Sequence, residues 1–249
     1  MESQFCIIVP HFNHGQQLAS LLPELLDYGL PLIIVDDGSD PTNMKAVEKL
    51  VANIPQIRFE KMMVNQGKGA AVIRGIQLGN EQGFTHAIQI DADGQHKVTD
   101  IPRLITASNA HPESIVSGLP QFGEDIPKLR LYGRKFSLWW SRLETLSFEI
   151  LDAMCGFRVY PIPPFLNICN NQTIGQGMQF DTEILVRSSW RGQPIQFVPI
   201  KVKYPPSGIS HFHMLRDNMH ISWLHTRLVF GMLLRLPRLI DRMTTVHQV

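Results

Sequence analysis

The sequence predicts an α/β fold in which a mostly parallel central sheet is flanked by helices. Short runs of β-branched and other apolar residues alternate with longer segments that carry apolar residues at helical spacing, which is typical of strand–helix–strand units. The chain has 249 residues, so it is long enough for one large domain of this kind and too short for two full catalytic domains.

Four strand–helix alternations are expected in the first part of the chain. The predicted strands cover residues 5–9, 32–35, 57–63 and 87–90. The helices that follow them are expected around residues 18–26, 42–52, 70–78 and 101–110. Parallel strands joined in this way have right-handed crossovers, and their ligands bind at the carboxyl ends of the strands.

The pattern changes after a strand at residues 115–118. The remaining elements are expected in the order helix 128–151, strand 155–160 ending at Pro161, helix 181–190, strand 195–203 and a helical segment from about residue 214. We therefore expect a main domain at residues 1–210 and a basic, amphipathic helical segment at residues 211–249.

Composition and charge exclude several classes of protein. The 23 Lys and Arg residues nearly balance the 22 Asp and Glu residues, so the chain has no strong field that would recruit nucleic acid. Three cysteines without C-x-x-C spacing indicate reduced thiols. No signal peptide is recognised, and no charge-free apolar run reaches the length of about 18 residues that a membrane span needs. We expect a cytoplasmic protein.

Polar motifs follow each of the first four predicted strands. They are Pro10-His11-Phe12-Asn13, Asp36-Asp37-Gly38-Ser39, Asn65-Gln66-Gly67-Lys68-Gly69 and Asp91-Ala92-Asp93-Gly94-Gln95-His96. If the sheet is parallel, all four motifs lie at the same edge of it. This convergence is the main argument for an active site at that edge.

The last of these motifs predicts a site for a divalent cation. Asp91 and Asp93 stand directly after a strand, where both carboxylates can share one Mg²⁺ or Mn²⁺ and leave positions for phosphate oxygens. Asp93 is the expected ligand, Asp91 shares metal or ribose binding, and Gln95 offers a further oxygen. An ordinary turn is the alternative for this motif. His96 is interpreted as a structural hydrogen-bonding residue, with a metal or substrate contact as the alternative.

Two other motifs suit a nucleotide. The carboxylates of Asp36 and Asp37 can accept hydrogen bonds from ribose hydroxyls or a base N–H, and the alternative is a turn that caps the next helix. Gly67 and Lys68 open a helix whose N-terminus suits an anionic group, although the spacing is not that of a P-loop. A plain tight connection is the alternative there.

These motifs occur in a definite order between about residues 5 and 211. They are Pro10-x-Phe12-Asn13, Val35-Asp36-Asp37-Gly38-Ser39, Asn65-x-Gly67-Lys68-Gly69, Asp91-x-Asp93-x-Gln95, Cys155-Gly156-Phe157-Arg158-x-Tyr160 and Gly208-x-Ser210. In this order they resemble the family 2 glycosyltransferases, which have a Rossmann-like GT-A fold. Within that family they resemble the branch of dolichyl-phosphate mannose synthases and polyprenyl-phosphate glycosyltransferases.

The resemblance implies a UDP- or GDP-sugar donor and a divalent metal, Mg²⁺ or Mn²⁺. The implied donor contacts are Pro10, Phe12, Asn13, Asp36, Asp37, Gly67, Lys68 and Asp91, and the implied metal ligands are Asp91, Asp93 and Gln95. It also implies inversion at the anomeric carbon by direct displacement. Asp93 counts as catalytic because the metal stabilises the departing diphosphate.

The sequence departs from the family at the late Gly-x-Ser motif. Relatives carry an arginine and a lysine around it, where this chain has Pro205 and His211. Lys203, His211 or His213 is expected to supply the missing charge.

An acceptor phosphate is expected to bind the helix that begins near residue 128. Relatives place an arginine after the fifth predicted strand, where this chain has Leu119-Pro120. The expected replacements are Arg130 and Arg134 on one helical face, Ser137 one turn later, and Arg158. A solvated helix surface is the alternative.

Asp181 and Glu183 are the candidates for a general base. A phosphate acceptor is already anionic and attacks without a base, whereas a sugar hydroxyl needs a nearby carboxylate. The alternative is that both acids only stabilise the first turn of a helix.

The C-terminal segment predicts a helix that lies on a membrane surface. On a helical wheel its cations fall within about a third of a turn and apolar residues occupy the remainder. The cations are Arg216, His220, Arg227, Arg235, Arg238 and Arg242. A helix packed on the domain with a charged outer face is the alternative, and Pro237 is expected to kink it.

The function expected from these features is inverting, metal-dependent transfer of a sugar from a nucleotide diphosphate to a lipid-linked or polyprenyl-phosphate acceptor at the cytoplasmic face of the membrane. One alternative is transfer to a soluble or glycan hydroxyl with Asp181 or Glu183 as base. Another is a non-catalytic nucleotide-sugar-binding protein. A nucleotidyltransferase is disfavoured because the first strand is not followed by a basic, glycine-rich loop.

Overall fold

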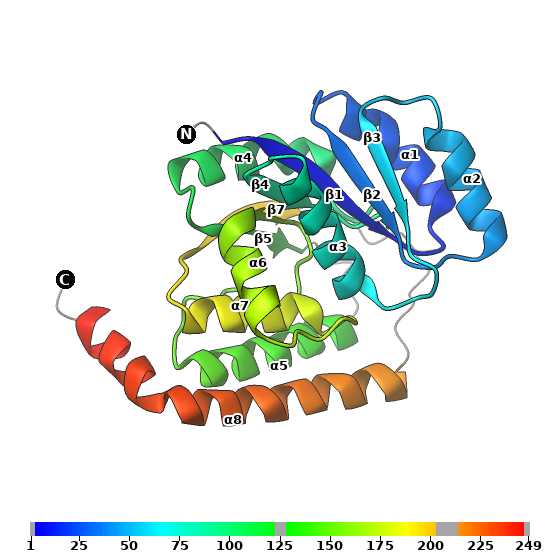
Figure 1. Cartoon of the computed structure of the whole chain (residues 1–249). Coiled ribbons are helices and arrows are strands. Elements are labelled where there is room, and N and C mark those ends of the chain that lie inside the picture. Colours follow the sequence, from blue (N-terminus) through cyan, green and yellow to red (C-terminus); the bar gives the residue numbers. More distant parts are fainter. Residues whose placement is uncertain (1–2, 123–127, 203–213, 247–249) are drawn as a thin grey trace.

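The computed structural model describes residues 3–122, 128–202 and 214–246, and within them seven strands form one central sheet (Figure 1). The strands are β1 Phe5–His11, β2 Leu32–Asp36, β3 Ile57–Lys61, β4 His86–Gln89, β5 Ile115–Gln121, β6 Arg158–Pro161 and β7 Ile195–Lys201. Their order across the sheet is β3-β2-β1-β4-β6-β5-β7.

Most of the neighbouring strands are parallel. The parallel pairs are β1 with β2, β1 with β4, β2 with β3, and β5 with β7. Only β6, among the described strands, runs antiparallel to its neighbours β4 and β5. The predicted α/β fold with a mostly parallel sheet is therefore confirmed.

Helices cover both faces of the sheet, as the alternation predicts. They are α1 Gly15–Leu26, α2 Pro41–Val51, α3 Lys68–Glu81, α4 Ile101–Ala110, α5 Lys128–Thr145, α6 Ile162–Asn171, α7 Phe180–Trp190 and α8 Met214–Val246, with a 3-10 turn at Val98–Asp100 before α4. Helix α6 was not predicted. It starts in the proline-rich stretch after β6, because a proline in the first helical turn gives up only a backbone donor that has no partner there.

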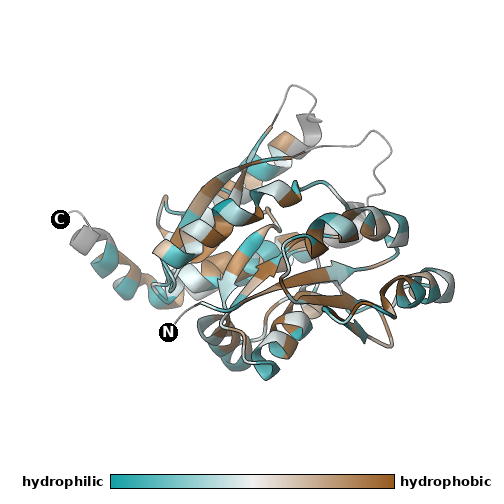
Figure 2. Cartoon of the chain, turned by 90° about the horizontal axis from the view of Figure 1, so that it is seen from above, coloured by the Kyte–Doolittle hydropathy of each residue, from teal (hydrophilic) through white to brown (hydrophobic). Residues whose placement is uncertain are grey.

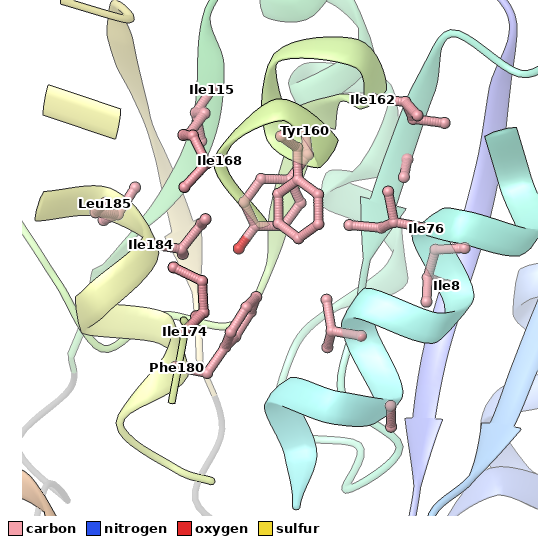
Figure 3. Packing of buried hydrophobic residues seen from close by; sticks show 14 of the residues in the cluster. Ile8, Ile76, Ile115, Tyr160, Ile162, Ile168, Ile174, Phe180, Ile184 and Leu185 are labelled. Carbon is pink, nitrogen blue, oxygen red and sulfur yellow. The ribbon is translucent and has the colours of Figure 1, made fainter. Parts of the chain in front are cut away.

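Two apolar cores lie on opposite faces of the sheet. Alternate residues of one strand, such as Ile7 and Ile8 in β1, point into different cores because side chains alternate along a strand. Helices α1, α2 and α4 cover one core, and α3, α6 and α7 cover the other, where Tyr160 and Phe180 are among the largest side chains (Figure 3). In Figure 2 hydrophobic residues run along the strands, whereas the helices carry both kinds of residue.

Helix α5 ends earlier than the sequence predicts. The expected helix extends to residue 151, but α5 ends at Thr145 because Leu146 takes a left-handed conformation with φ of 49°. The segment that follows returns to the sheet. In it the Asp152 side chain pairs with Arg134, and the Ala153 carbonyl accepts a hydrogen bond from Arg158.

Helix α8 packs beside α5 and α7 along one side of the molecule (Figure 1). Leu224 and Leu228 are buried in the same core as α7, and His225 Nδ1 lies 2.7 Å from Oε1 of the buried Glu144 in α5. The helix remains continuous through Pro237 and bends in its C-terminal part. The predicted boundary between residues 210 and 211 lies outside the described residues.

Candidate active site at the carboxyl ends of the strands

The carboxyl ends of β1 and β2 are joined by a buried histidine–carboxylate pair. His11 and Asp36 are register partners, and His11 Nδ1 lies 2.7 Å from Asp36 Oδ1. Asp36 also accepts hydrogen bonds from the backbone N–H of Ser39 and from its hydroxyl. Although burial opposes ionisation, the hydrogen bonds from His11 and Ser39 lower the pKa of Asp36. Asp36 is thus an ionised carboxylate that holds the loop after β2.

Asp37 holds the loop that precedes helix α3. Its Oδ1 accepts from the N–H of Gln66 at 2.7 Å, and its Oδ2 accepts from the N–H of Gly67 at 2.8 Å and from the Asn65 side chain. Burial, with repulsion from Asp36 added, raises the pKa of Asp37 despite these bonds. The predicted nucleotide-binding carboxylates therefore also shape the loops of the site.

Gly67 has to be glycine at this point. Its φ is 104°, and a Cβ atom there would lie 2.5 Å from the carbonyl oxygen of Gln176. The loop before α3 is thus pressed against the segment that leads to α7, which brings Lys68 close to the start of that helix.

The loop after β1 is tied to the loop after β2. Asn13 has a φ of 55°, its N–H donates to the Ser39 hydroxyl, and its side-chain oxygen accepts from the N–H of Asp40. Pro10 is buried in β1, and Phe12 is half-buried beside Asn13. These predicted donor contacts all lie at the edge of the sheet where the sequence places them.

Lys68 is the centre of the site. Its Nζ donates to Asp91 Oδ2 at 2.8 Å and to Asp181 Oδ2 at 2.7 Å. The amide Nε2 of Gln89 lies 3.4 Å from the other oxygen of each carboxylate. Burial would lower the pKa of Lys68, but the two carboxylates outweigh it and raise the pKa. A charged lysine thus joins the end of β4 to the first turn of α7.

The two acids of the predicted metal site differ in their surroundings. Burial works against ionisation of Asp91, but Lys68 lowers its pKa. Burial and the neighbouring Asp91 raise the pKa of Asp93, whose Oδ1 accepts from the N–H of Gln95 at 3.0 Å. Asp93 is therefore the carboxylate of the pair whose charge is least compensated by the protein.

His96 lies beside these acids. Burial lowers the pKa of its ring, which packs on Phe157 at a centroid distance of 5.4 Å. Its Nδ1 is buried and has no hydrogen-bond partner among the described residues. One ring nitrogen beside the metal motif is therefore left without a partner from the described protein.

The described residues contain no group of three or more His, Cys, Asp or Glu side chains arranged to hold a metal ion. Asp91 and Asp93 nevertheless suit Mg²⁺ or Mn²⁺, because both ions accept a small number of carboxylate oxygens and complete their shell with substrate phosphate and water. The uncompensated charge of Asp93 and the unpaired Nδ1 of His96 agree with that fit.

The two candidate bases point in different directions. Asp181 faces Lys68 and Gln89, within the site. Glu183 is fully buried elsewhere, where it accepts hydrogen bonds from Arg187, Arg227 and the N–H of Gly175. Only Asp181 is thus brought together with the strand-end motifs.

The residues predicted to bind the acceptor phosphate are mostly engaged by the protein. Arg134 pairs with Asp152, and the Ser137 hydroxyl lies 3.4 Å from that of Thr182. Arg158 is fully buried and donates to the backbone carbonyl of Asp181 at 2.7 Å and to that of Ala153 at 3.0 Å.

Arg158 therefore positions the first turn of α7, which carries Asp181. The side chain of Arg130 lies outside the described residues, as do Lys203, His211 and His213.

Three residues of the site were not assigned a role from the sequence. His11 and Ser39 support Asp36, and Gln89 contacts both Asp91 and Asp181. Gln89 carried a usable signal, because a buried amide at the end of an otherwise apolar run needs a polar partner.

The C-terminal helix is oriented differently from the prediction. Three of the cations that were expected to meet lipid phosphates contact the protein instead: Arg227 pairs with Glu183, Arg235 lies 4.7 Å above the Trp190 ring, and Arg242 donates to the Ser189 carbonyl. His220 and Arg238 remain exposed. The solvent-facing side of α8 is mainly apolar, with Met219, Trp223, Phe230, Leu233 and Leu234 exposed.

The fold and the site define an α/β protein whose polar groups gather at the carboxyl ends of parallel strands, as in nucleotide-binding enzymes. A model of glycosyl transferase family 2 matches residues 6–160. The chain therefore belongs to glycosyl transferase family 2, and it is a glycosyltransferase.

Relatives and a solved structure agree with this assignment. Polyprenol monophosphomannose synthase of Mycolicibacterium smegmatis is 26% identical over 211 residues, covering 82% of this chain and 79% of that protein. A dolichyl-phosphate beta-glucosyltransferase of Trichomonas vaginalis is 28% identical over 213 residues, covering 78% of this chain and 62% of that protein.

The crystal structure of glucosyl-3-phosphoglycerate synthase from Mycobacterium tuberculosis with Mn²⁺ and UDP-glucose has a TM-score of 0.68 at 14% identity, covering 92% of this chain and 79% of that one. The predicted GT-A fold is thereby confirmed.

Proposed function

We propose that this glycosyltransferase moves a sugar from a UDP- or GDP-sugar to a polyprenyl- or dolichyl-phosphate acceptor, with inversion and with Mg²⁺ or Mn²⁺. The observation that carries the proposal is the Lys68–Asp91–Asp181 cluster beside Asp93. The named lipid-phosphate acceptors of the relatives support the acceptor class.

Asp93, Asp91 and Gln95 are the residues that would hold the metal, which neutralises charge on the departing nucleoside diphosphate when bound. The Lys68 ammonium group, which donates to Asp91, balances the negative charge of that carboxylate. The loops held by Asp36 and Asp37 are the proposed contacts for the nucleoside, since their backbone is fixed by buried carboxylates before a donor arrives.

Two contacts lead us to assign Asp181 rather than Glu183 to the reacting side. Asp181 is paired with Lys68 in the site, whereas both Glu183 oxygens are bound by the protein. A phosphate acceptor needs no base. If the acceptor were a hydroxyl, which is our second candidate, Asp181 would have to release Lys68 and accept the proton.

We also propose that the protein works at the cytoplasmic face of a membrane. No helix in the described part of the chain is long and apolar enough to cross a membrane. The exposed apolar side chains of α8, together with Tyr132, Phe136 and Trp139 of α5, would give a peripheral contact with the lipid that carries the acceptor.

A thermal-shift panel of UDP-, GDP- and dTDP-sugars with and without Mn²⁺ would identify the donor, because a bound donor stabilises the folded state. The stabilised pair is then tested for sugar transfer to a polyprenyl phosphate. Metal-dependent transfer that Asp93→Ala abolishes would support the proposal. Donor binding without transfer to any acceptor would instead favour the non-catalytic alternative.

A further inference from the structure

A pocket lies at the opposite end of helix α7 from Asp181 and Lys68. It has a volume of about 710 Å³ and is bordered by α6, by the C-terminal end of α7, by the loop that precedes β7 and by the second half of α8. Asp181 is in the first turn of α7 and Trp190 is its last residue, so the two ends are separated by roughly 14 Å at the usual rise of a helix.

Four arginines and one carboxylate residue are in the lining of this pocket. The arginines are Arg191, Arg235, Arg238 and Arg242, and the acid is Glu113. No ion pair among the described residues joins any of the four to a carboxylate. Positive charge therefore accumulates here, although the protein as a whole has a formal net charge of only +1.

The contacts that these arginines do make are with neutral groups. Arg191 donates to the Asn167 side-chain oxygen at 3.1 Å, Arg242 to the Ser189 carbonyl, and Arg235 to the Gly231 carbonyl at 2.9 Å. The Arg235 guanidinium lies over the Trp190 ring. These contacts orient the guanidinium groups without neutralising them.

The arginines also repel one another. Burial lowers the pKa of Arg235, and the neighbouring Arg187, Arg238 and Arg191 lower it further. Of these three neighbours, Arg187 pairs with Glu183 at 2.6 Å and does not line the pocket, whereas Arg191 and Arg238 line it and have no carboxylate partner among the described residues. Guanidinium groups bind phosphate through paired N–H donors, and an anion between them would relieve this repulsion.

We propose that this pocket binds a phosphate group, at a site separate from the one at the strand ends. The phosphate belongs either to a free phosphate compound or to the head group of an anionic lipid. Leu239, Ile168 and Pro164 add an apolar wall, which suits a ligand with a non-polar part next to its phosphate. The inference does not depend on the proposed sugar transfer.

The test compares the wild-type protein with R191Q/R238Q, since both side chains are exposed and their loss leaves the core intact. The matched control is K45Q/K49Q, which removes two exposed cations from α2. One measurement is pyrophosphate binding by calorimetry without divalent metal. The other is sedimentation with phosphatidylglycerol vesicles and with neutral phosphatidylcholine vesicles.

We expect binding of at least one of the two anionic probes to weaken at least about tenfold in R191Q/R238Q and to stay unchanged in K45Q/K49Q. Loss of pyrophosphate binding identifies a free phosphate compound, and loss of binding only to phosphatidylglycerol vesicles identifies a lipid head group. Failure of the wild type to bind either probe, or equal binding by all three proteins, would overturn the proposal. These binding results do not affect the proposed sugar transfer, which is tested separately with Asp93→Ala.

Discussion

At the scale of single residues, the acids of α7 have separate tasks although they are two positions apart. Asp181 belongs to the Lys68 cluster, and Glu183 compensates Arg187 and Arg227 in the interior. Asp181→Asn should therefore lower sugar transfer by less than about tenfold if the acceptor is a phosphate, and by a factor of about 100 or more if it is a hydroxyl that needs a base.

Glu183→Gln is the matched comparison. It leaves two partly buried arginines without their fully buried carboxylate partner, so the free energy of unfolding should fall by about 3 kcal/mol, as measured by urea denaturation. A Glu183→Gln protein with normal stability and no activity would contradict this division of tasks.

The Asp36 carboxylate makes a pH-dependent contribution to stability. Because the pKa of Asp36 is lowered in the folded state, its contribution is present above the unfolded pKa of about 3.9 and is lost as pH falls through the lower, folded value. Asp36→Asn should therefore cost about 2 kcal/mol at pH 7, and the difference from wild type should shrink below about pH 4. Chemical denaturation across this range measures it. A difference in the free energy of unfolding that stays constant with pH would show that the charge of Asp36 does not contribute to stability.

At the scale of elements, the close packing of α3 on β1 depends on Gly75. A Cβ at this position would lie 2.4 Å from the Ile8 side chain, so Gly75→Ala should destabilise the protein by about 2 kcal/mol. Gly133 in the middle of α5 has open space around it, and Gly133→Ala should stabilise by up to about 1 kcal/mol. Thermal or urea unfolding of both variants checks this, and equal effects would refute the packing argument.

At the scale of the whole molecule, the sequence predicts what depends on local pattern and on strand-end geometry. The strands, the parallel sheet and the convergence of Asp36, Lys68 and Asp91 follow from alternation and connection rules. The hydrogen-bond partners of these residues cannot be predicted from such rules. Lys68 and Asp181 are 113 positions apart, and no local pattern shows which carboxylate of α7 turns toward the lysine.

The orientation of α8 was mispredicted for the same reason. A helical wheel separates cations from apolar residues correctly, but it cannot tell which side the rest of the protein covers. Glu183, Trp190 and the Ser189 carbonyl lie on another helix and bind three of the arginines, so much of the cationic side faces inward. The side left in solvent carries large apolar residues.

This exposed apolar side leads to a prediction for the whole molecule at a membrane. Trp223 is 63% exposed and Leu234 is 85% exposed, on one face of α8, and burying each such side chain in the acyl boundary is worth about 1.5–3 kcal/mol. W223S/L234S should therefore weaken sedimentation with neutral phosphatidylcholine vesicles at least about tenfold, with an unchanged circular dichroism spectrum.

Removing α8 altogether would be a poorer test, because Leu224 and Leu228 are part of the core and the truncated protein would lose their packing. Met63→Ser is the matched control, since Met63 is 93% exposed in the loop after β3 and does not belong to α8. Vesicle binding that W223S/L234S leaves intact, or a wild-type protein that does not bind vesicles, would remove the basis for placing α8 in the lipid interface. Loss of binding in W223S/L234S alone would mean that the membrane contact is made by apolar side chains of α8.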